Sequence, residues 1–304
     1  FRRFLAENKI TRADYKYFVS YKIPAGEAAH DSNFREVLTF IKDPTGYPYI
    51  PGSSLKGAIR TALGAYLLKK DNFAGLRREI ETADSSGPPR RYLQRESSRL
   101  EEKLFYRLDI KDSDGRVLKN AVNDFMQGIR ISDSAPIGFE NLTLAGKYDR
   151  RPDGTETRLP VFREVLIPGS EARFSMTLDI PILTKAGIDL QDIEDALHSF
   201  ADEHYANFEE HFVEKADDAD ISTQDGVDLI LGGGAGYVSK TLTYNLFPER
   251  ERGVKMVEKI MVKQFPRHKH DKDAARYKVS PHMLKTTMYG GQYYQMGRCE
   301  LLLK

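Results

Sequence analysis

Three observations predict an α+β fold of the ferredoxin-like type for this sequence. Apolar side chains recur between residues 55 and 67 at the three-and-four spacing of a buried helix face. Apolar and polar side chains alternate between residues 172 and 180, which is typical of a half-buried strand. From residue 166 onward the order is strand, long helix, strand, glycine loop, helix and strand. That order favours α+β units over an all-helical or sandwich fold.

The first part of the chain combines a helical start with one strong helix. Residues 1–22 are expected to be helical and then irregular, and residues 43–46 (Asp-Pro-Thr-Gly) form a turn. The prolines of residues 47–52 keep that stretch extended, and Ser53 is a suitable N-cap for the helix that follows. The charged region 77–104 is expected to be partly helical, from residue 92 to residue 105.

The second part is expected to contain most of the strands. Residues 129–132 and 142–148 are typical of strands, and residues 150–157 form a hairpin tip that returns through 159–167. A long amphipathic helix begins at Asp189, a short strand covers 227–231, and a final strand covers 295–303. We expect two units with insertions, over residues 1–165 and 166–304, the second carrying the glycine-rich loop.

Composition excludes several classes of protein. The 304 residues include 46 Lys and Arg against 45 Asp and Glu, so a net charge of +1 gives no bulk affinity for nucleic acid, and any binding surface must come from charge segregation. The single cysteine, Cys299, excludes an internal disulfide and a cysteine-based zinc site. No run of about 18 apolar residues and no signal peptide is visible, which predicts a cytoplasmic protein without a membrane partner.

The glycine-rich segment from Leu231 to Thr241 permits two functional readings and a structural one. Residues 234–241 differ from a nucleotide-binding P-loop only at Ser239, where that loop has glycine, and Pro248 leaves little room for the helix that should follow. Alternatively, the glycines let an RNA backbone approach, with Lys240 supplying charge and Tyr237 stacking on a base. A plain structural turn is the third possibility.

Two further segments could contact phosphate groups. The turn at residues 51–52 opens a helix whose free amides, serine hydroxyls and Lys56 converge at its positive end, although a simply capped core helix fits equally well. Gly57 stands where alanine would be preferred, which suggests a close approach. A basic stretch with tyrosines, residues 259–294, suits single-stranded RNA or a solvated charged face.

The sequence offers little support for catalysis. Seven histidines are scattered at positions 30, 198, 204, 211, 268, 270 and 282, and none forms a His-Glu-x-x-His zinc site. The acidic run at Asp217, Asp218 and Asp220 lacks the glycine and distal glutamate of a calcium loop. His30 or Asp43 could serve a ribonuclease, but a structural role is the usual one. We therefore expect no enzyme, no metal and no cofactor.

Residues 47–60 (Tyr-Pro-Tyr-Ile-Pro-Gly-Ser-Ser-Leu-Lys-Gly-Ala-Ile-Arg) resemble the hallmark segment of the CRISPR RAMP superfamily, RNA-binding proteins built on RNA-recognition-motif folds. Further segments are similar, in this order, to the family of fifth subunits of the type III-A Csm complex: residues 130–134, 160–164, 231–241 and 293–297. The similarity runs from about residue 34 to the end. Members of that family begin with a strand and a glycine-containing loop that residues 1–10 do not match, so we expect the first strand of the N-terminal unit to be missing from this chain.

The resemblance implies a non-catalytic RNA-binding subunit that caps the effector filament by the 3′ end of the guide RNA and is needed for guide RNA maturation. It implies guide RNA, the backbone subunit and other Csm subunits as partners, with target RNA and host nucleases as further candidates. A guide-processing endoribonuclease and a P-loop nucleotidase are the alternatives. The residues expected to contact RNA are Ser53, Ser54, Lys56, Gly57, Arg60, Arg130, Ser132, Gly232, Gly233, Gly234, Gly236, Tyr237, Ser239, Lys240, Thr241 and Lys285.

Overall fold

The computed structural model describes residues 2–30, 36–212 and 226–303 and confirms the α+β class. Its α-helices are α1 (Arg2–Glu7), α2 (Gly52–Lys70), α3 (Ala74–Thr82), α4 (Gln94–Phe105), α5 (Ile180–Ala186), α6 (Leu190–Asn207), α8 (Thr243–Leu246), α9 (Arg250–Gln264) and α10 (Asp273–Arg276). Its strands are β1 (Val37–Leu38), β2 (Ile129–Ile131), β3 (Leu142–Arg150), β4 (Glu156–Leu166), β5 (Met176–Leu178), β6 (Leu229–Ile230), β7 (Leu284–Tyr289), β8 (Gln292–Gln295) and β9 (Arg298–Cys299).

The main sheet has five strands in the order β1-β4-β3-β7-β8. The β3–β4 hairpin forms its centre, and a bulge between Gly146 and Lys147 bends it. β1 runs parallel to β4, whereas β7 is antiparallel to both β3 and β8. The strands come from both sides of residue 165, so the boundary between two units at that position stays a prediction.

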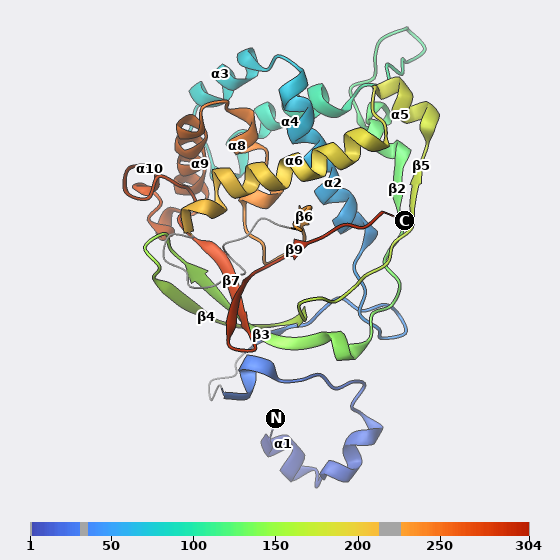
Figure 1. Ribbon diagram of the computed structural model, residues 1–304, viewed down its shortest axis with the longest axis vertical. Coiled ribbons are helices and arrows are strands. Elements are labelled where there is room, and N and C mark those ends of the chain that lie inside the picture. Colours follow the sequence, from blue (N-terminus) through green and yellow to red (C-terminus); the bar gives the residue numbers. More distant parts are fainter. Residues whose placement is uncertain (1, 31–35, 213–225, 304) are drawn as a thin grey trace.

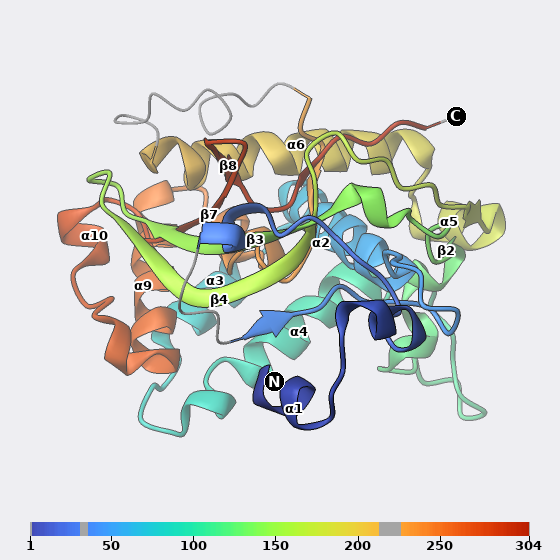
Figure 2. The same cartoon turned by 90° about the horizontal axis from the view of Figure 1, so that it is seen from below.

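A layer of helices covers one side of this sheet, and the segment that contains α1 lies on the other side (Figure 1). Seen from the sheet side, the β3–β4 hairpin curves across the front of the helices (Figure 2). The expected helix at 55–67 is confirmed as α2, and its core face includes the fully buried Ile59, Leu63 and Leu67. This face packs against α6, which begins after Asp189 as the sequence predicts, because the Asp189 carboxylate accepts the Asp192 N–H at 2.9 Å.

The start of α2 is fixed by close contact with the end of β2. A β-carbon placed on Gly52 would lie 2.2 Å from the carbonyl oxygen of Ser132, so only glycine fits. The Gly52 N–H donates to the Asp133 carboxylate at 2.9 Å, and the Ser134 N–H donates to the Ile50 carbonyl oxygen at the same distance. Residues 48–52 and 131–137 therefore hold each other in place.

Two expected strands are shorter than the sequence indicates. Only residues 176–178 of the alternating stretch 172–180 form a strand, because the partner strand β2 has three residues. The expected strand 295–303 is broken at Gly297, whose φ is +90°. The Leu231 carbonyl oxygen lies so close to Gly297 that a β-carbon on this residue would be 2.0 Å from the oxygen. Among the described residues, no helix is long and apolar enough to cross a membrane.

Candidate nucleic-acid interface

The glycine-rich loop follows the two-residue strand β6 and lies against the turn between β8 and β9. The Leu231 N–H donates to the Gly297 carbonyl oxygen at 2.7 Å, and a β-carbon on Gly234 would lie 2.7 Å from the Met296 methyl group. Gly232 and Gly236 both have φ of +94°, a backbone conformation that residues other than glycine rarely adopt. Gly232 and Gly233 are exposed, so part of the loop presents bare backbone to the surface.

Basic side chains from three strands of the main sheet surround this loop. A β-carbon on Gly233 would lie 3.7 Å from a terminal guanidinium nitrogen of Arg163 on β4, and one on Gly236 would lie 3.6 Å from Cγ of Lys285 on β7. Lys147 on β3 and Lys240 on the loop itself complete what we call the loop cluster: Lys147, Arg163, Lys240 and Lys285.

The loop cluster carries an excess of positive charge. Burial lowers the pKa of Lys147, and the positive charges of Lys285, Arg163 and Lys240 lower it further, whereas the negative charge of Asp149 raises it. Lys285 has an acidic partner, the Asp149 carboxylate at 2.5 Å. Within the described part of the chain, the charged groups of Lys147, Arg163 and Lys240 have no ion pair. An anion at this position would relieve the repulsion, as a phosphate group does.

The first turn of α2 presents small polar groups to solvent. Ser53 and Ser54 are exposed, and among the described residues neither hydroxyl has a hydrogen-bond partner. The expected N-cap at Ser53 is wrong, because Gly52 already belongs to α2 and Pro51 occupies the N-cap position. Gly57 is also exposed, and a β-carbon there would meet nothing within 4 Å. The space that Gly57 leaves is therefore open to an external molecule rather than filled by the protein.

Three predicted cations lie at this helix start. Burial lowers the pKa of Lys56, while Asp124 raises it and Arg60 and Arg130 lower it, so these charges lie close together. Arg60 is held internally, since its guanidinium binds Asp124 at 2.7 Å and stacks 3.7 Å above the ring of Phe105. Arg130 is more available, because its side chain is 68% exposed and the one ion pair it forms within the described residues, to Asp179, is 3.7 Å long.

The hydroxyl of Ser132 has a structural role. It accepts the Ser175 N–H at 2.9 Å and donates to the Asp133 carbonyl oxygen at 2.8 Å. Its position next to Gly52 nevertheless places it beside the start of α2.

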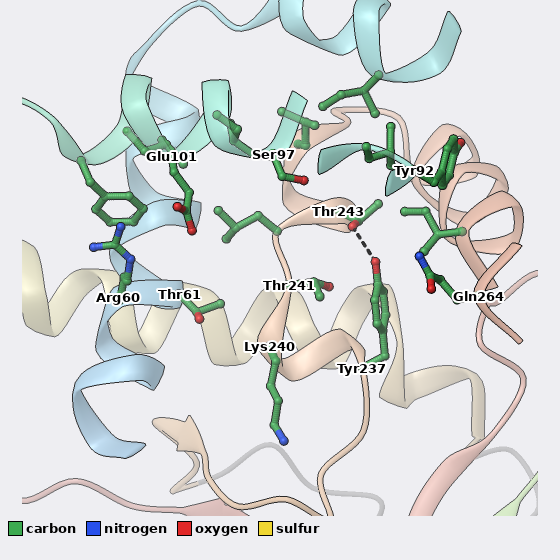
Figure 3. A pocket seen from close by; sticks show the side chains of 18 residues that line it. Arg60, Thr61, Tyr92, Ser97, Glu101, Tyr237, Lys240, Thr241, Thr243 and Gln264 are labelled. Atoms are coloured by element: carbon green, nitrogen blue, oxygen red, sulfur yellow. Dashed lines mark hydrogen bonds between the residues drawn. The ribbon is translucent and has the colours of Figure 1, made fainter. Parts of the chain in front are cut away.

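A cavity of about 360 Å³ lies between a later turn of α2 and the glycine segment, and the exposed first turn of α2 does not line it. Arg60 and Thr61 of α2 line one side, and Tyr237, Lys240 and Thr241 of the glycine segment line another (Figure 3). Helix α4 and helix α9 complete the walls. Segments that are far apart in the sequence thus line one cavity, which neither pattern predicted alone.

The side chains of the glycine segment point in different directions. Lys240 points away from the cavity and is exposed, as expected of a phosphate ligand (Figure 3). Tyr237 instead points into the cavity, where its hydroxyl lies 3.1 Å from that of Thr243, so the expected stacking of a base on an open tyrosine ring is wrong for this conformation. Ser239 is only 3% exposed and Thr241 lines the cavity, so neither hydroxyl lies on the outer surface.

The P-loop alternative does not fit this geometry. A P-loop connects a strand to the N-terminus of a helix, whereas here a 3₁₀ turn (Val238–Lys240) follows the glycines and α8 spans only four residues. Ser239, at the position of the missing glycine, is buried instead of facing a phosphate.

The candidate nuclease residues and the basic stretch have other surroundings. Asp43 caps its own turn, and the hydroxyl and N–H of Thr45 help to lower the pKa of its carboxyl group. The side chain of His30 and the acidic run 217–220 lie outside the described residues. In the basic stretch, Lys259 and Lys263 on α9 donate to carbonyl oxygens of residues 81, 83 and 85, so these two lysines stabilise the chain after α3.

Lys147 and Arg163 were not among the residues predicted to contact RNA. Arg163 lies in a segment that carries the family resemblance, but a strand pattern alone does not tell which neighbouring strand or loop a side chain will face. The pairing of β3 with both β4 and β7 brings these cations to the glycine loop. The order of the strands in the main sheet must be known before Lys147 and Arg163 can be placed beside the glycine loop.

The chain belongs to the RAMP superfamily, whose family model matches residues 23–239. That range includes the start of α2, Lys147, Arg163 and most of the glycine segment. The resemblance to the Csm5 branch is also confirmed: the chain is 29% identical to the CRISPR system Csm5 protein of Mycobacterium tuberculosis over 275 residues, which cover 88% of this chain and 67% of the relative. It is 27% identical to the Csm5 protein of Streptococcus thermophilus, covering 79% of this chain and 60% of that protein.

Solved structures support the same fold. The crystal structure of T. onnurineus Csm5 superposes with a TM-score of 0.56 at 18% identity, covering 99% of this chain and 82% of that chain. A chain in a cryo-EM structure of a Csm–crRNA–target RNA ternary complex of a type III-A CRISPR-Cas system gives a TM-score of 0.52 at 19% identity, covering 85% and 74%. The chain spans about two thirds of the length of the curated relatives it matches.

Proposed function

We propose that the chain is a non-catalytic, RNA-binding subunit of a type III-A CRISPR Csm effector complex. In this proposal it caps the filament near the 3′ end of the guide RNA and is needed for guide RNA maturation. Its partners are the guide RNA, the backbone subunit and other Csm subunits, with target RNA and host nucleases as further partners. The similarity to proteins named Csm5 supports the assignment to this complex.

The observation that carries RNA binding is the exposed backbone of Gly232 and Gly233 beside Lys147, Arg163 and Lys240, three cations that have no ion pair among the described residues. RNA phosphates need positive charge and N–H or O–H donors, and both are present on this surface. The exposed backbone of Gly232 and Gly233 lets a nucleic-acid backbone approach more closely than side chains would allow.

The helix start supplies a second contact of a different kind. In the first turn of α2 the Gly52 N–H already donates to the Asp133 carboxylate and the Ser54 N–H to the Pro51 carbonyl oxygen, but the partial positive charge of the helix start still favours an anion. Ser53 and Ser54 add exposed hydroxyl donors, and the open space at Gly57 leaves room for a ribose or phosphate. The arrangement binds the RNA backbone and reads no base sequence, which suits a subunit that must accept any guide.

The test is co-purification of the tagged full chain from cells that express the other Csm proteins and a precursor guide RNA. We expect the wild-type chain to bring down Csm subunits and RNA of discrete length. A variant with Lys147→Gln, Arg163→Gln and Lys240→Gln should still bring down the subunits but retain much less RNA. Arg116→Gln, which removes an arginine that is 80% exposed and outside the loop cluster, is the matched control. Failure of the wild-type chain to bring down Csm proteins would refute the assignment.

The absence of catalysis needs its own assay. Purified chain should leave precursor RNA intact with and without Mg²⁺. Discrete cleavage that His30→Ala or Asp43→Ala abolishes would establish the endoribonuclease alternative instead.

A further inference from the structure

Three buried side chains between α9 and β7 meet in a second cluster, unrelated to the RNA surface. His270, Asp273 and His282 are 6%, 1% and 5% exposed, and one ligand atom of each lies within 4.8 Å of the other two. Nδ1 of His270 lies 2.8 Å from one carboxylate oxygen of Asp273, and Nδ1 of His282 lies 2.5 Å from the other. The sequence did not predict this group, because the histidines looked scattered along the chain.

The cluster buries a carboxylate between two imidazole rings. Asp273 is an almost fully buried carboxylate, and among the described residues its only ion-pair partners are the two histidines. No lysine or arginine in that part of the chain neutralises it. A buried carboxylate is costly unless it is paired or bound to a metal ion.

We propose that His270, Asp273 and His282 bind a Zn²⁺ ion. Imidazole nitrogens and a carboxylate oxygen are ligands that zinc prefers. At metal–ligand bonds of about 2.0–2.2 Å, tetrahedral ligand atoms lie about 3.3–3.5 Å apart. The two separations between Asp273 oxygens and histidine nitrogens, 2.8 and 2.5 Å, must therefore widen by less than about 1 Å, and all three ligand atoms already lie within 4.8 Å of one another. The exposed ring of His268, stacked 6.3 Å from that of His270, supplies the fourth ligand by rotation of its side chain.

The residues around the cluster orient these ligands. The Ser280 hydroxyl donates to the Asp273 carboxylate at 2.8 Å, and the Tyr244 hydroxyl donates to the Ser280 carbonyl oxygen at 2.6 Å. Tyr277 stacks on His282 with 5.4 Å between ring centroids. Such outer contacts fix ring orientation in metal sites.

A metal ion here would have a structural role. It would join the segment after α9 to residue 282, two positions before β7 begins, and β7 carries Lys285 of the loop cluster. Zinc would thus stabilise the end of the sheet that supports the glycine loop.

The test measures zinc in the full chain, produced without a histidine tag in zinc-supplemented medium and purified without chelator. We expect about one zinc ion per chain by mass spectrometry of the metal, and loss of that zinc in the variant with His270→Ala and His282→Ala. The matched control is His198→Ala, since His198 is exposed and pairs with Asp228 instead. Zinc retained by the double variant would overturn the proposal.

A second measurement covers the case in which the double variant does not fold. Chelator-treated wild-type chain is titrated with Co²⁺, which should produce the visible absorption bands of a tetrahedral site, and Zn²⁺ should raise its melting temperature. Wild-type chain that contains less than a tenth of an ion and shows neither effect would overturn the proposal.

Discussion

The sharpest prediction concerns the salt dependence of RNA binding. Three cations of the loop cluster, Lys147, Arg163 and Lys240, have no ion pair within the described residues and are therefore available to phosphate groups. Each phosphate contact on single-stranded nucleic acid contributes about −0.7 to the slope of log K against log salt concentration. Three contacts contribute about −2.1, which corresponds to about a 20-fold loss of affinity between about 50 and 200 mM salt.

The assay is fluorescence anisotropy of a labelled single-stranded RNA, titrated with purified chain at several KCl concentrations. Replacement of all three cations by glutamine should make the slope shallower by about 2. A 20-fold factor corresponds to about 1.8 kcal/mol, so the difference in binding free energy between the wild-type chain and the triple variant should be about 1.8 kcal/mol larger at about 50 mM than at about 200 mM salt. Glutamine keeps most of the side-chain length, and circular dichroism checks that the variant is folded.

Two controls separate charge from structure. Arg116→Gln should leave the slope unchanged, since this residue lies outside the loop cluster. Lys285→Gln should change the slope less than Lys240→Gln, because Lys285 is already paired with Asp149. A slope that is the same for the wild-type chain and the triple variant would refute the role of the loop cluster.

Three further predictions follow from single positions. Gly57→Ala should stabilise α2 by about 1 kcal/mol, which raises the melting temperature by about 2 °C. The same change should weaken RNA binding, and an unchanged RNA affinity would mean that no RNA group approaches this position. Gly52→Ala should destabilise the fold by about 1–3 kcal/mol in urea unfolding, since its β-carbon would meet the Ser132 carbonyl oxygen, and an unaltered midpoint would contradict that contact. Burial would raise the pKa of Glu164, but hydrogen bonds from Lys42, a tyrosine hydroxyl and a backbone N–H lower it. The ionised Glu164 therefore stabilises the fold fully above the unfolded pKa of about 4.3, and this stabilisation is lost as the pH falls through the folded pKa. The stability difference between the wild-type chain and Glu164→Gln should therefore shrink below about pH 4, and a difference that is constant with pH would contradict it.

Local patterns predicted the elements of the fold better than their partners. The apolar spacing of residues 55–67 and of the residues that follow Asp189 was sufficient to locate α2 and the start of α6. Strand lengths were less predictable, because β5 ends where its partner β2 ends, and the last strand breaks where Gly297 contacts Leu231. Those limits depend on residues far away in the sequence.

In the candidate site, too, local motifs were predictable from the sequence and contacts between distant segments were not. The glycine segment and the start of α2 were visible as short motifs, since glycines and a proline-glycine turn have strong local signatures. Lys147 and Arg163 have no such signature, and only the sheet brings them to the loop. The inward direction of Tyr237 likewise depends on the cavity between the helices and the loop.

Ultraviolet cross-linking of the assembled complex, followed by mass spectrometry of the cross-linked peptides, tests the central claim most directly. The account predicts that peptides of this chain cross-linked to guide RNA contain residues 53–60 or the glycine segment 232–241. Cross-links confined to other surfaces of the chain, or a complex that contains guide RNA with no cross-link to this chain, would contradict it.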